Sequence, residues 1–432
     1  MADSPWKNRW SKDQIRALLL EQADSFWKSD IGTPREALQK ITQAASSPHA
    51  VIISGLRQVG KSTLLAQFAH QIDQDTFYYL NFEDDRFLGF TALDYNDLYE
   101  ALVETFGQRQ IFIIDEIQNI PGWEHFVRRF MDQGFKFYIS GSNASLLSRE
   151  LGTRLTGRYI PIELFPFSFH EYLNFYGYPL PDFSRMKTAD HANLNAQLSA
   201  FLQSGGIPVA LKYPEYSHLP TLYNDVLYRD IATRYQIEGV AQLRELSAFI
   251  MAHPASTISF NKLKERLQIK SLNTVKSYLS YLENSWLAFT INVYDYSLKR
   301  QQIAPKKVYC IDSGLANAVG FHFSANSGHL LENLVFLQLR RSTQSVYYLN
   351  LANNGEEIDF YLPEKKIAIQ VCLDLNLPDT REREIRALVS AQKVFPIERA
   401  LILTHANEET ISADGLQIEV CSISHWLLES GN

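Results

Sequence analysis

The sequence predicts an α/β protein with a parallel sheet that carries a phosphate-binding loop, a helical lid, a winged helix-turn-helix and a second α/β domain. Three observations predict this fold class. Short apolar runs alternate with helical stretches from residue 46 to residue 165, which is typical of a parallel sheet covered on both faces. A glycine-rich loop follows the first of these runs. A helix and a second series of strand-like runs follow residue 313.

The length and composition indicate several globular domains. The 432 residues carry 41 lysines and arginines against 48 aspartates and glutamates, a net charge of −7, and a domain typically has ~100–200 residues. A hydrophobic fraction of 46% and a charged fraction of 21% exclude a wholly disordered chain. We expect an N-terminal helical segment at 1–45, a phosphate-loop core at 46–165, a helical lid at 166–240, a winged helix at 241–312 and a C-terminal α/β domain at 313–432.

The sequence also predicts a cytoplasmic protein with no membrane partner. Its longest apolar runs are strand-sized and fall short of the ~18 residues of a membrane helix. The N-terminus, MADSPWKNRW, has no apolar region of the signal-peptide kind. The three cysteines are odd in number and far apart, which favours neither a disulfide framework nor a metal site.

The elements of the first 165 residues follow from the spacing of apolar side chains. Residues Ser11–Lys28 place them at roughly helical intervals, and Ser11 is a suitable N-cap. Five apolar runs predict the strands of the sheet, at residues 50–54, 77–81, 111–114, 136–140 and 159–163.

The first of these strands leads into a nucleotide-binding motif. Residues Gly55–Ser62 fit G-x-x-x-x-G-K-[ST] at every fixed position, between a predicted strand and a predicted helix. The backbone N–H groups of such a loop and the N-terminus of its helix attract phosphates. We expect Lys61 to reach the β- and γ-phosphates and Ser62 to bind Mg²⁺. The predicted ATP-binding residues are Gly55, Gln58, Val59, Gly60, Lys61, Ser62 and Thr63.

Two carboxylates end the strand at 111–114 and predict the second half of this site. Asp115 and Glu116 follow four apolar residues, so both lie at the edge of the sheet from which the phosphate loop also emerges. We expect Asp115 to hold Mg²⁺ together with Ser62. We expect Glu116 to act as the general base that activates the attacking water.

Polar residues at the end of the next strand complete the predicted active site. Ser142 and Asn143 follow the strand at 136–140, and a polar side chain there could orient the water or contact the γ-phosphate. We expect Asn143 to contribute to catalysis in this way. Serine and asparagine also favour turns, and the alternative interpretation gives the two residues no chemical role.

Arg158 is a candidate for completing a neighbouring subunit's active site. It immediately precedes the strand at 159–163, after Arg149 and Arg154 on the preceding helical stretch. A guanidinium supplied by a neighbour can offset negative charge in the transition state of phosphoryl transfer. This role predicts a homo-oligomer. The alternative is an arginine that is solvated or ion-paired.

These residues resemble those of the AAA+ ATPases, and more narrowly those of one prokaryotic family. That family joins an AAA+ module to a C-terminal domain of unknown function, of the DUF4143 type, with a restriction-endonuclease-like core. The resemblance runs from about residue 30 to the C-terminus and implies ATP binding, hydrolysis and oligomeric assembly. The motifs that carry it are Asp115–Gln118, Pro121–Glu124, Gly157–Arg158, Ser204–Pro208, Tyr228–Ile231, Tyr309–Leu315 and Glu332–Phe336.

A basic segment predicts a winged helix that contacts DNA. Nine basic and three acidic residues between Ser256 and Lys307 give this segment a net charge of +6. We expect a recognition helix at residues 273–285, capped by Asn273, and a wing at Tyr296–Lys307. Lys276 on the helix, with Lys299 and Arg300 on the wing, would contact phosphates. The alternative is a winged helix that only packs between domains.

The C-terminal domain departs from the nuclease pattern that the resemblance brings with it. Restriction-endonuclease-like nucleases need a helix glutamate, a strand aspartate and a Glu-x-Lys on the next strand to hold metal ions and stabilise charge. Glu332 and Asp359 match the first two, whereas Gln370 and Cys372 stand in place of the glutamate and the lysine. Glu356 or Glu357 could replace one ligand. The sequence therefore favours a structural or binding role over nuclease activity.

Together these observations predict a Mg²⁺-dependent ATPase whose turnover rearranges a DNA- or protein-binding C-terminal region. Two alternatives stay open. One is a nucleotide-gated DNA-binding protein with little turnover, and the other is a metal-dependent nuclease switched by ATP.

Overall fold

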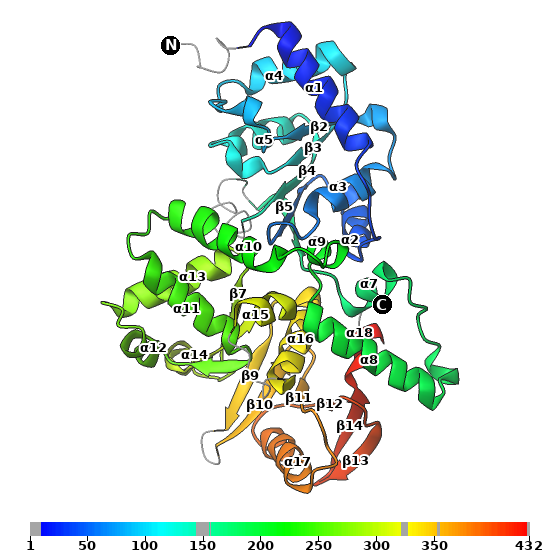
Figure 1. Cartoon of the computed structure of the whole chain (residues 1–432), viewed down its shortest axis with the longest axis vertical. Helices are drawn as coiled ribbons and strands as arrows, with labels where there is room; N and C mark the ends of the chain where they lie inside the picture. The colour runs from blue at the N-terminus through cyan, green and yellow to red at the C-terminus, as the bar shows by residue number, and fades with distance from the viewer. Residues whose placement is uncertain (1–9, 144–154, 156, 321–326, 352–354, 430–432) are drawn as a thin grey trace. The chain divides into compact units, whose positions relative to one another are not determined.

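The computed structural model describes residues 10–143, 155, 157–320, 327–351 and 355–429 (Figure 1). The chain forms two compact units, Met1–Leu164 and Phe165–Asn432. Arg149 and Arg154 lie outside the described residues, so the structure does not place them. The finer division of the chain into five segments stays a proposal. Within the described ranges, no helix has the length and apolar character needed to cross a membrane.

The first unit is built on a five-stranded sheet in which all neighbouring strands are parallel. The strands lie in the order β2-β3-β4-β1-β5, so β4 separates the strand before the phosphate loop from the strand that ends in Asp115. Most side chains of β1, β3 and β4 are buried, which agrees with the apolar runs of the sequence, whereas the first half of β5 is partly exposed. The strands are β1 (Ala50–Gly55), β2 (Phe77–Asn81), β3 (Ile111–Asp115), β4 (Lys136–Gly141) and β5 (Tyr159–Leu164).

Helices flank this sheet and supply the apolar faces that it needs. They include α2 (Ala37–Gln43), α3 (Lys61–Ala69), α4 (Tyr95–Phe106) and α5 (Trp123–Asp132). An aromatic cluster fills the space beside β3, where the rings of Tyr95 and Phe126 stack with centroids 4.2 Å apart and Phe112 stacks on Phe137 at 5.0 Å. Stacked aromatic pairs contribute ~0.5–1.5 kcal/mol beyond the area that they bury.

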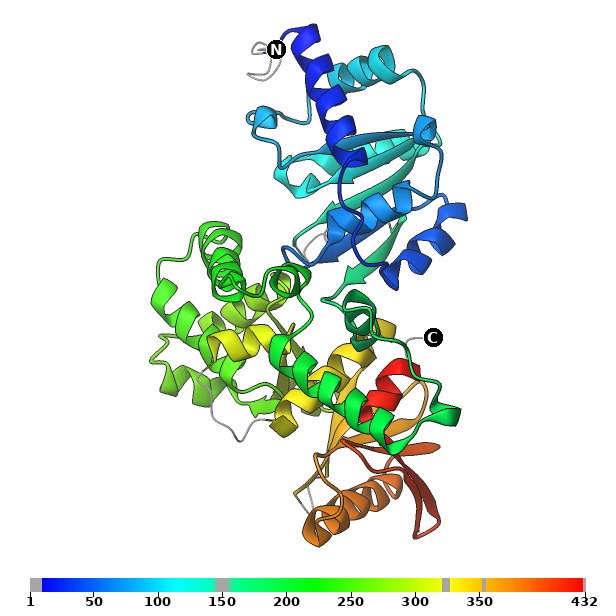
Figure 2. The same cartoon turned by 45° about the vertical axis from the view of Figure 1, so that its right-hand side comes forward.

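The N-terminal helix is part of this unit. Helix α1 (Lys12–Trp27) begins at Ser11, whose hydroxyl accepts from the N–H of Gln14 in a capping box, so the sequence prediction is confirmed. Its buried face packs against helix α4 and strand β2. In both views this blue helix runs beside the sheet of the first unit (Figures 1 and 2). On that face Gln22 donates a hydrogen bond to the backbone carbonyl of Asn81 at the end of β2.

The second unit begins with helices and contains two sheets. The first helices are α7 (Phe169–Phe175), α8 (Thr188–Ser204), α9 (Pro208–Lys212) and α10 (His218–Asp225). A π-helical stretch, Val226–Thr233, continues α10. The following elements are α11 (Val240–Ala252), β6 (Ser256–Ile258), α12 (Phe260–Arg266), α13 (Leu272–Asn284), β7 (Ala288–Ile291), α14 (Leu298–Ile303) and β8 (Lys306–Cys310).

The three short strands form an antiparallel sheet in the order β6-β8-β7. Two details of the sequence prediction were wrong here. The cap of α13 is Ser271, whose hydroxyl accepts from the N–H of Thr274, because the helix starts before Asn273. The predicted wing, Tyr296–Lys307, contains helix α14, which Ser297 caps, and its last residue, Lys307, is buried.

The C-terminal part holds a six-stranded mixed sheet in the order β13-β14-β12-β11-β10-β9. The apolar spacing of the sequence predicts a helix at 328–341 and strands at 346–349, 357–362, 366–371 and 400–403. The structure confirms them to within two residues as α16 (Ser327–Ser342), β9 (Tyr347–Leu351), β10 (Glu356–Leu362), β11 (Ile367–Val371) and β12 (Arg399–Thr404). Four further elements were not predicted from the sequence: α17 (Pro378–Gln392), β13 (Glu409–Ala413), β14 (Leu416–Ser422) and α18 (Ile423–Glu429). Helix α17, in orange, packs against β10 (Figure 2).

Two of the sequence motifs interlock in this unit. Asp312 caps helix α15 (Ser313–Val319) by accepting from the N–H of Leu315 at 2.8 Å, and it also accepts from the N–H of Gly206 at 2.7 Å. A Cβ atom on Gly314 would lie 2.0 Å from the carbonyl oxygen of Ser204. Burial raises the pKa of Asp312 to about 6, while these backbone donors oppose the rise. The two motifs therefore serve packing within the second unit.

Candidate functional site

The phosphate loop connects β1 to α3 in the conformation that the motif requires. Gln58 and Gly60 adopt left-handed φ values of 62° and 95°, and Gly60 is the N-cap of α3. A Cβ atom on Gly55 would lie 2.2 Å from the carbonyl oxygen of Leu164, so only glycine fits at this position. The loop thus ends at a helix N-terminus, where N–H groups and the helix dipole favour an anion.

The side chain of Lys61 is held over the phosphate loop by backbone carbonyl groups of that loop. Its ammonium group donates to the carbonyl oxygens of Leu56 at 3.1 Å and Gly55 at 3.3 Å, and the residue is only 4% exposed. The same nitrogen lies 3.7 Å from Oε1 of Glu116. The lysine is therefore already directed at the space between the phosphate loop and the end of β3.

Asp115 lies buried at the end of β3 and accepts hydrogen bonds from Ser140 and Ser62. Burial and the neighbouring Glu116 raise the pKa of Asp115, and these two hydroxyls together with Lys61 oppose the rise. A cation beside Asp115 would favour its ionised form. Hydroxyl and carboxylate oxygens are the ligands that Mg²⁺ prefers, so Ser62 and Asp115 together suit this ion.

Glu116 turns toward the same space in a strained backbone conformation. Its φ of 51° is rare for a residue with a side chain, and such conformations persist where the surroundings impose them. The N–H of Glu116 donates to Ser140 Oγ at 3.2 Å. The side-chain amide of Gln118 contacts the carboxylate of Glu116 and lies 3.3 Å from the hydroxyl of Ser142. Gln118 therefore links the ends of β3 and β4, and sequence reasoning gave it no role.

Asn143 lies beside the first strand, as the predicted position between the two halves of the site requires. The backbone carbonyl oxygen of Asn143 accepts a hydrogen bond from the hydroxyl of Ser54 at 2.9 Å, and both residues are buried. Ser142 is likewise buried, next to Gln118. The structure thus brings Lys61, Asp115, Glu116 and Asn143 to one edge of the sheet.

Arg158 does not join this group within one chain. It immediately precedes β5, where its carbonyl oxygen accepts from the N–H of Ala50 at the start of β1. Five residue steps along β1, or ~17 Å of extended strand, separate Ala50 from Gly55. The guanidinium of Arg158 instead pairs with Asp132 at 2.7 Å.

Two features of the loop's surroundings escaped sequence reasoning. Arg35, which precedes α2 and is 5% exposed, donates a hydrogen bond to the backbone carbonyl oxygen of Val59 at 2.8 Å. This contact stabilises the phosphate loop. A cavity of about 420 Å³ opens beside Ser62 and Thr63 and is lined in part by α1. The N-terminal helix therefore forms one wall of a cavity that reaches the two hydroxyl residues of the phosphate loop. No spacing signal in the sequence connects either feature to the loop.

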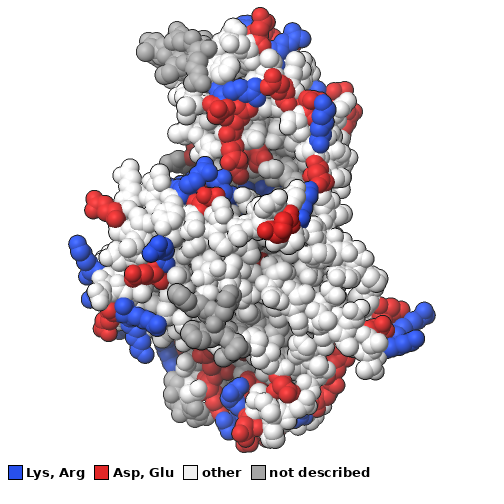
Figure 3. All heavy atoms as spheres, in the orientation of Figure 1, with Lys and Arg blue, Asp and Glu red and all other residues white. Residues whose placement is uncertain are grey.

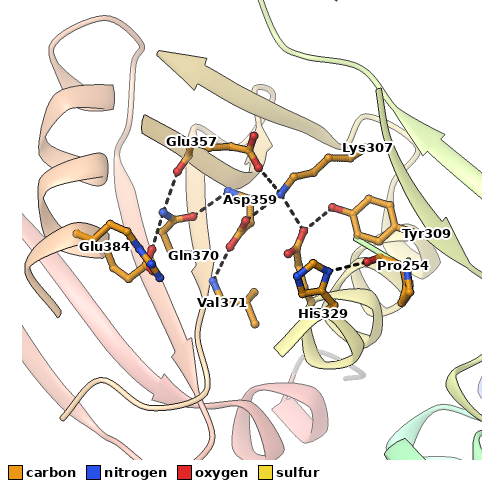
Figure 4. A network of polar contacts seen from close by, with 11 residues as sticks. Pro254, Lys307, Tyr309, His329, Glu357, Asp359, Gln370, Val371 and Glu384 are labelled. Carbon is orange, nitrogen blue, oxygen red and sulfur yellow. Dashed lines mark hydrogen bonds and ion pairs between the residues drawn. The ribbon is translucent and has the colours of Figure 1, made fainter. Parts of the chain in front are cut away.

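A second polar site lies in the C-terminal sheet, where Glu332 and Asp359 meet as the nuclease pattern predicts. Lys307 of β8, which the sequence analysis assigned to the basic segment, contacts both carboxylates, and Figure 4 shows it beside Asp359. Its ammonium group lies 2.9 Å from Glu332, 2.7 Å from Glu357 and 2.9 Å from Asp359. Burial and Asp359 raise the pKa of Glu332, while Lys307 and Tyr309 oppose the rise.

Comparisons with known proteins agree with the first site. Residues 47–173 match the family model described as AAA domain, and residues 195–326 match a domain of unknown function, DUF8612. The Walker-type ATPase of Pyrococcus abyssi is a solved structure with a TM-score of 0.41 and 14% identity, covering 68% of this chain and 99% of that one. The sheet, the phosphate loop and the family match define the class of the first unit: it contains an AAA domain of the P-loop type.

Relatives along nearly the whole chain define the family more narrowly. The uncharacterized protein MJ1544 of Methanocaldococcus jannaschii is 33% identical over 398 residues, which cover 87% of this chain and 88% of that protein. The chain belongs to the family of MJ1544. An uncharacterized protein of Haemophilus influenzae is 28% identical over 408 residues, covering 91% of this chain and 97% of that protein. The DUF4143-type resemblance of the C-terminal region stays a prediction.

Proposed function

We propose that the protein binds ATP with Mg²⁺ and hydrolyses it at the phosphate loop. The observation that carries the proposal is that the buried lysine of the phosphate loop lies close to the two carboxylates at the end of β3. Lys61 lies within 3.7 Å of Glu116, and Asp115 is hydrogen bonded to Ser62. Bound Mg²⁺ would neutralise charge on the phosphates.

Each residue of this group has a distinct part in the proposed reaction. The N–H groups of the loop and Lys61 bind and orient the phosphates. Ser62 and Asp115 hold the metal ion. Glu116 takes a proton from the attacking water, because its carboxylate is partly exposed and Gln118 fixes its orientation. Asn143 lies at the end of β4, where a side chain can contact the water or the γ-phosphate.

The test of this proposal is ATP turnover by wild-type protein and Lys61→Ala. We expect the variant to lose at least ~10²–10³-fold in turnover, because it lacks the charge that stabilises the transferring phosphoryl group. Lys28→Ala is the matched control, since Lys28 is exposed and pairs only with Asp24 of its own helix among the contacts described. Equal turnover by Lys61→Ala and wild type would overturn the proposal.

We propose further that Arg158 acts on the nucleotide of a neighbouring subunit. Its distance from its own phosphate loop supports action between chains of a homo-oligomer. Arg158→Ala should then lose ~10³-fold or more in turnover, the order of effect known for arginine fingers. Mixing it with Lys61→Ala should restore activity, because each variant supplies what the other lacks. Wild-type turnover by Arg158→Ala would exclude this role, and exposed Arg128→Ala is the control.

DNA binding by residues 241–312 is a second candidate function. The order α11-β6-α12-α13-β7-α14-β8 and the central position of β8 support a winged helix with an additional helix, α14, in its wing. Lys276, Lys299 and Arg300 are exposed, although Arg300 pairs with Asp295 at 3.1 Å. On the face that Figure 3 shows, acidic and basic side chains are intermixed.

Charge reversal tests this second function. Lys276→Glu with Arg300→Glu should weaken binding of a fluorescent duplex DNA and lower the salt slope by about 2, one for each lost phosphate contact. Lys365→Glu, an exposed lysine of the β10–β11 turn, is the control. No binding by the wild type at low salt would remove the candidate. Salt-sensitive binding without ATP turnover would instead favour a nucleotide-gated DNA-binding protein.

We propose that hydrolysis drives movement of the second unit, which would carry the DNA- or protein-binding surface. DNA-stimulated turnover by the wild type would support this coupling. If the protein binds DNA but its rate of ATP turnover is the same with and without DNA, this coupling is contradicted.

A further inference from the structure

A cavity of about 620 Å³ in the second unit has walls that suit a cation. It lies among α16, β10, β11 and α17, and six carboxylates but only two arginines line it. The arginines are already paired, Arg383 with Glu384 at 2.6 Å and Arg386 with Glu356 at 3.0 Å. Three other carboxylates of the wall, those of Glu332, Glu357 and Asp359, share one centre, and Figure 4 shows Glu357 and Asp359 directed toward it.

The centre on which these three carboxylates converge holds the ammonium group of Lys307. Its side chain reaches the back of the wall from β8 and is 3% exposed. An ammonium group has three N–H donors, and each finds one carboxylate oxygen at 2.7–2.9 Å. The donors of Lys307 are therefore fully used by three acids from two other elements.

The same oxygens are those that a divalent ion would need. Asp359 accepts from Lys307 with Oδ1 and from the N–H of Val371 with Oδ2 at 2.9 Å. Glu332 Oε1 accepts from both Lys307 and the hydroxyl of Tyr309, at 2.9 and 2.8 Å. A metal ion at 2.0–2.6 Å from such oxygens would have to displace donors that are already in place.

The next strand offers no replacement ligand. Gln370 is neutral, and its amide oxygen accepts from the N–H of Asp359 at 2.8 Å. Its amide nitrogen donates to the carbonyl oxygen of Glu357 at 2.9 Å and to Glu384 at 2.8 Å. Burial raises the pKa of the Cys372 thiol to about 12, so it stays protonated. With Lys307 in place, the donor set therefore does not fit a divalent metal ion.

We infer that Lys307 is the resident cation of this pocket and takes the place that a divalent metal ion would otherwise occupy. It is a positioning residue that joins β8 to α16 and β10 by charge. Its presence closes the pocket to Mg²⁺ and Mn²⁺, and removal of its charge opens a metal site on the same three carboxylates. The inference is independent of ATP hydrolysis at the phosphate loop.

Mn²⁺ titration of the full-length protein without nucleotide tests this inference, with free Mn²⁺ measured by electron paramagnetic resonance. Wild type and Asp359→Asn should take up Mn²⁺ identically. Lys307→Met, which keeps the length of the chain without the charge, should gain one site that binds at least about tenfold more tightly than any site of the wild type. The double variant Lys307→Met with Asp359→Asn should lose that site again.

A comparison of wild-type protein with Asp359→Asn is sufficient to overturn the inference. A Mn²⁺ site in wild-type protein that disappears in Asp359→Asn would show that metal and lysine share the pocket. If Asp359→Asn does not fold, Glu357→Gln takes its place, because the Glu357 side chain is one-third exposed. A folded Lys307→Met that binds no additional Mn²⁺ would also contradict the inference. If Lys307→Met is soluble but unfolded, the comparison of Mn²⁺ uptake by wild type and Asp359→Asn tests the inference.

Discussion

Glu116→Gln should bind ATP as tightly as wild-type protein and turn it over ~10²–10⁴-fold more slowly. General-base catalysis contributes this much to a rate, and the amide keeps the shape of the carboxylate without its basicity. Glu116 also raises the pKa of Asp115 by like-charge repulsion. Loss of that charge should leave metal binding at Asp115 intact or slightly strengthened, so the defect falls on turnover alone.

The experiment measures ATP affinity by fluorescent-nucleotide titration and turnover by phosphate release on the same samples. Glu104→Gln is a matched control, because Glu104 is exposed on α4 and pairs with Lys12. Wild-type turnover would assign the proton transfer to another group. Loss of ATP binding would instead mean that Glu116 supports the loop through its contact with Lys61, at 3.7 Å.

The first site was predictable because its parts are local. A loop of fixed spacing after an apolar strand specifies both its conformation and the position of Lys61. Parallel strands place their carboxyl ends at one edge, so Asp115 and Asn143 could be assigned to the same site from sequence. Arg35 could not, because its contact with Val59 spans 24 residues and depends on how α2 packs.

The second site shows the opposite case. The charge count placed Lys307 among the surface residues of a basic segment, next to Lys306. Successive side chains of a strand point to opposite faces, so the two lysines of β8 have different surroundings, one partly exposed and one buried. The partners of Lys307 lie 25 to 52 residues further along the chain. Sequence patterns within one element carry no record of such a contact.

The motifs around Gly206 and Asp312 lie between these two cases. The sequence analysis recognised both by resemblance, without a role for either. Their interlock depends on 106 residues of intervening chain. A motif that looks functional can thus serve the packing of a buried carboxylate against backbone N–H groups.

Lys307→Met should lower the free energy of unfolding of the second unit by about 3–5 kcal/mol, the usual cost of removing one partner from a buried ion pair. Three carboxylates would then face one another without a cation in a site shielded from water. Lys365→Met is the matched control, because Lys365 is exposed in the same unit and its loss should change stability by less than ~0.5 kcal/mol.

Denaturant unfolding, monitored separately for each unit, measures this effect. The first unit should keep its midpoint in Lys307→Met, because Lys307 belongs to the second. Neutralising one acid should recover part of the loss, so Lys307→Met with Glu357→Gln should be more stable than Lys307→Met alone. Equal stability of Lys307→Met and wild type would mean that the ammonium group gains no more from the three carboxylates than it loses on leaving water. It would then be a tolerated charge, and the organisation of the pocket would rest on Gln370 and Asp359.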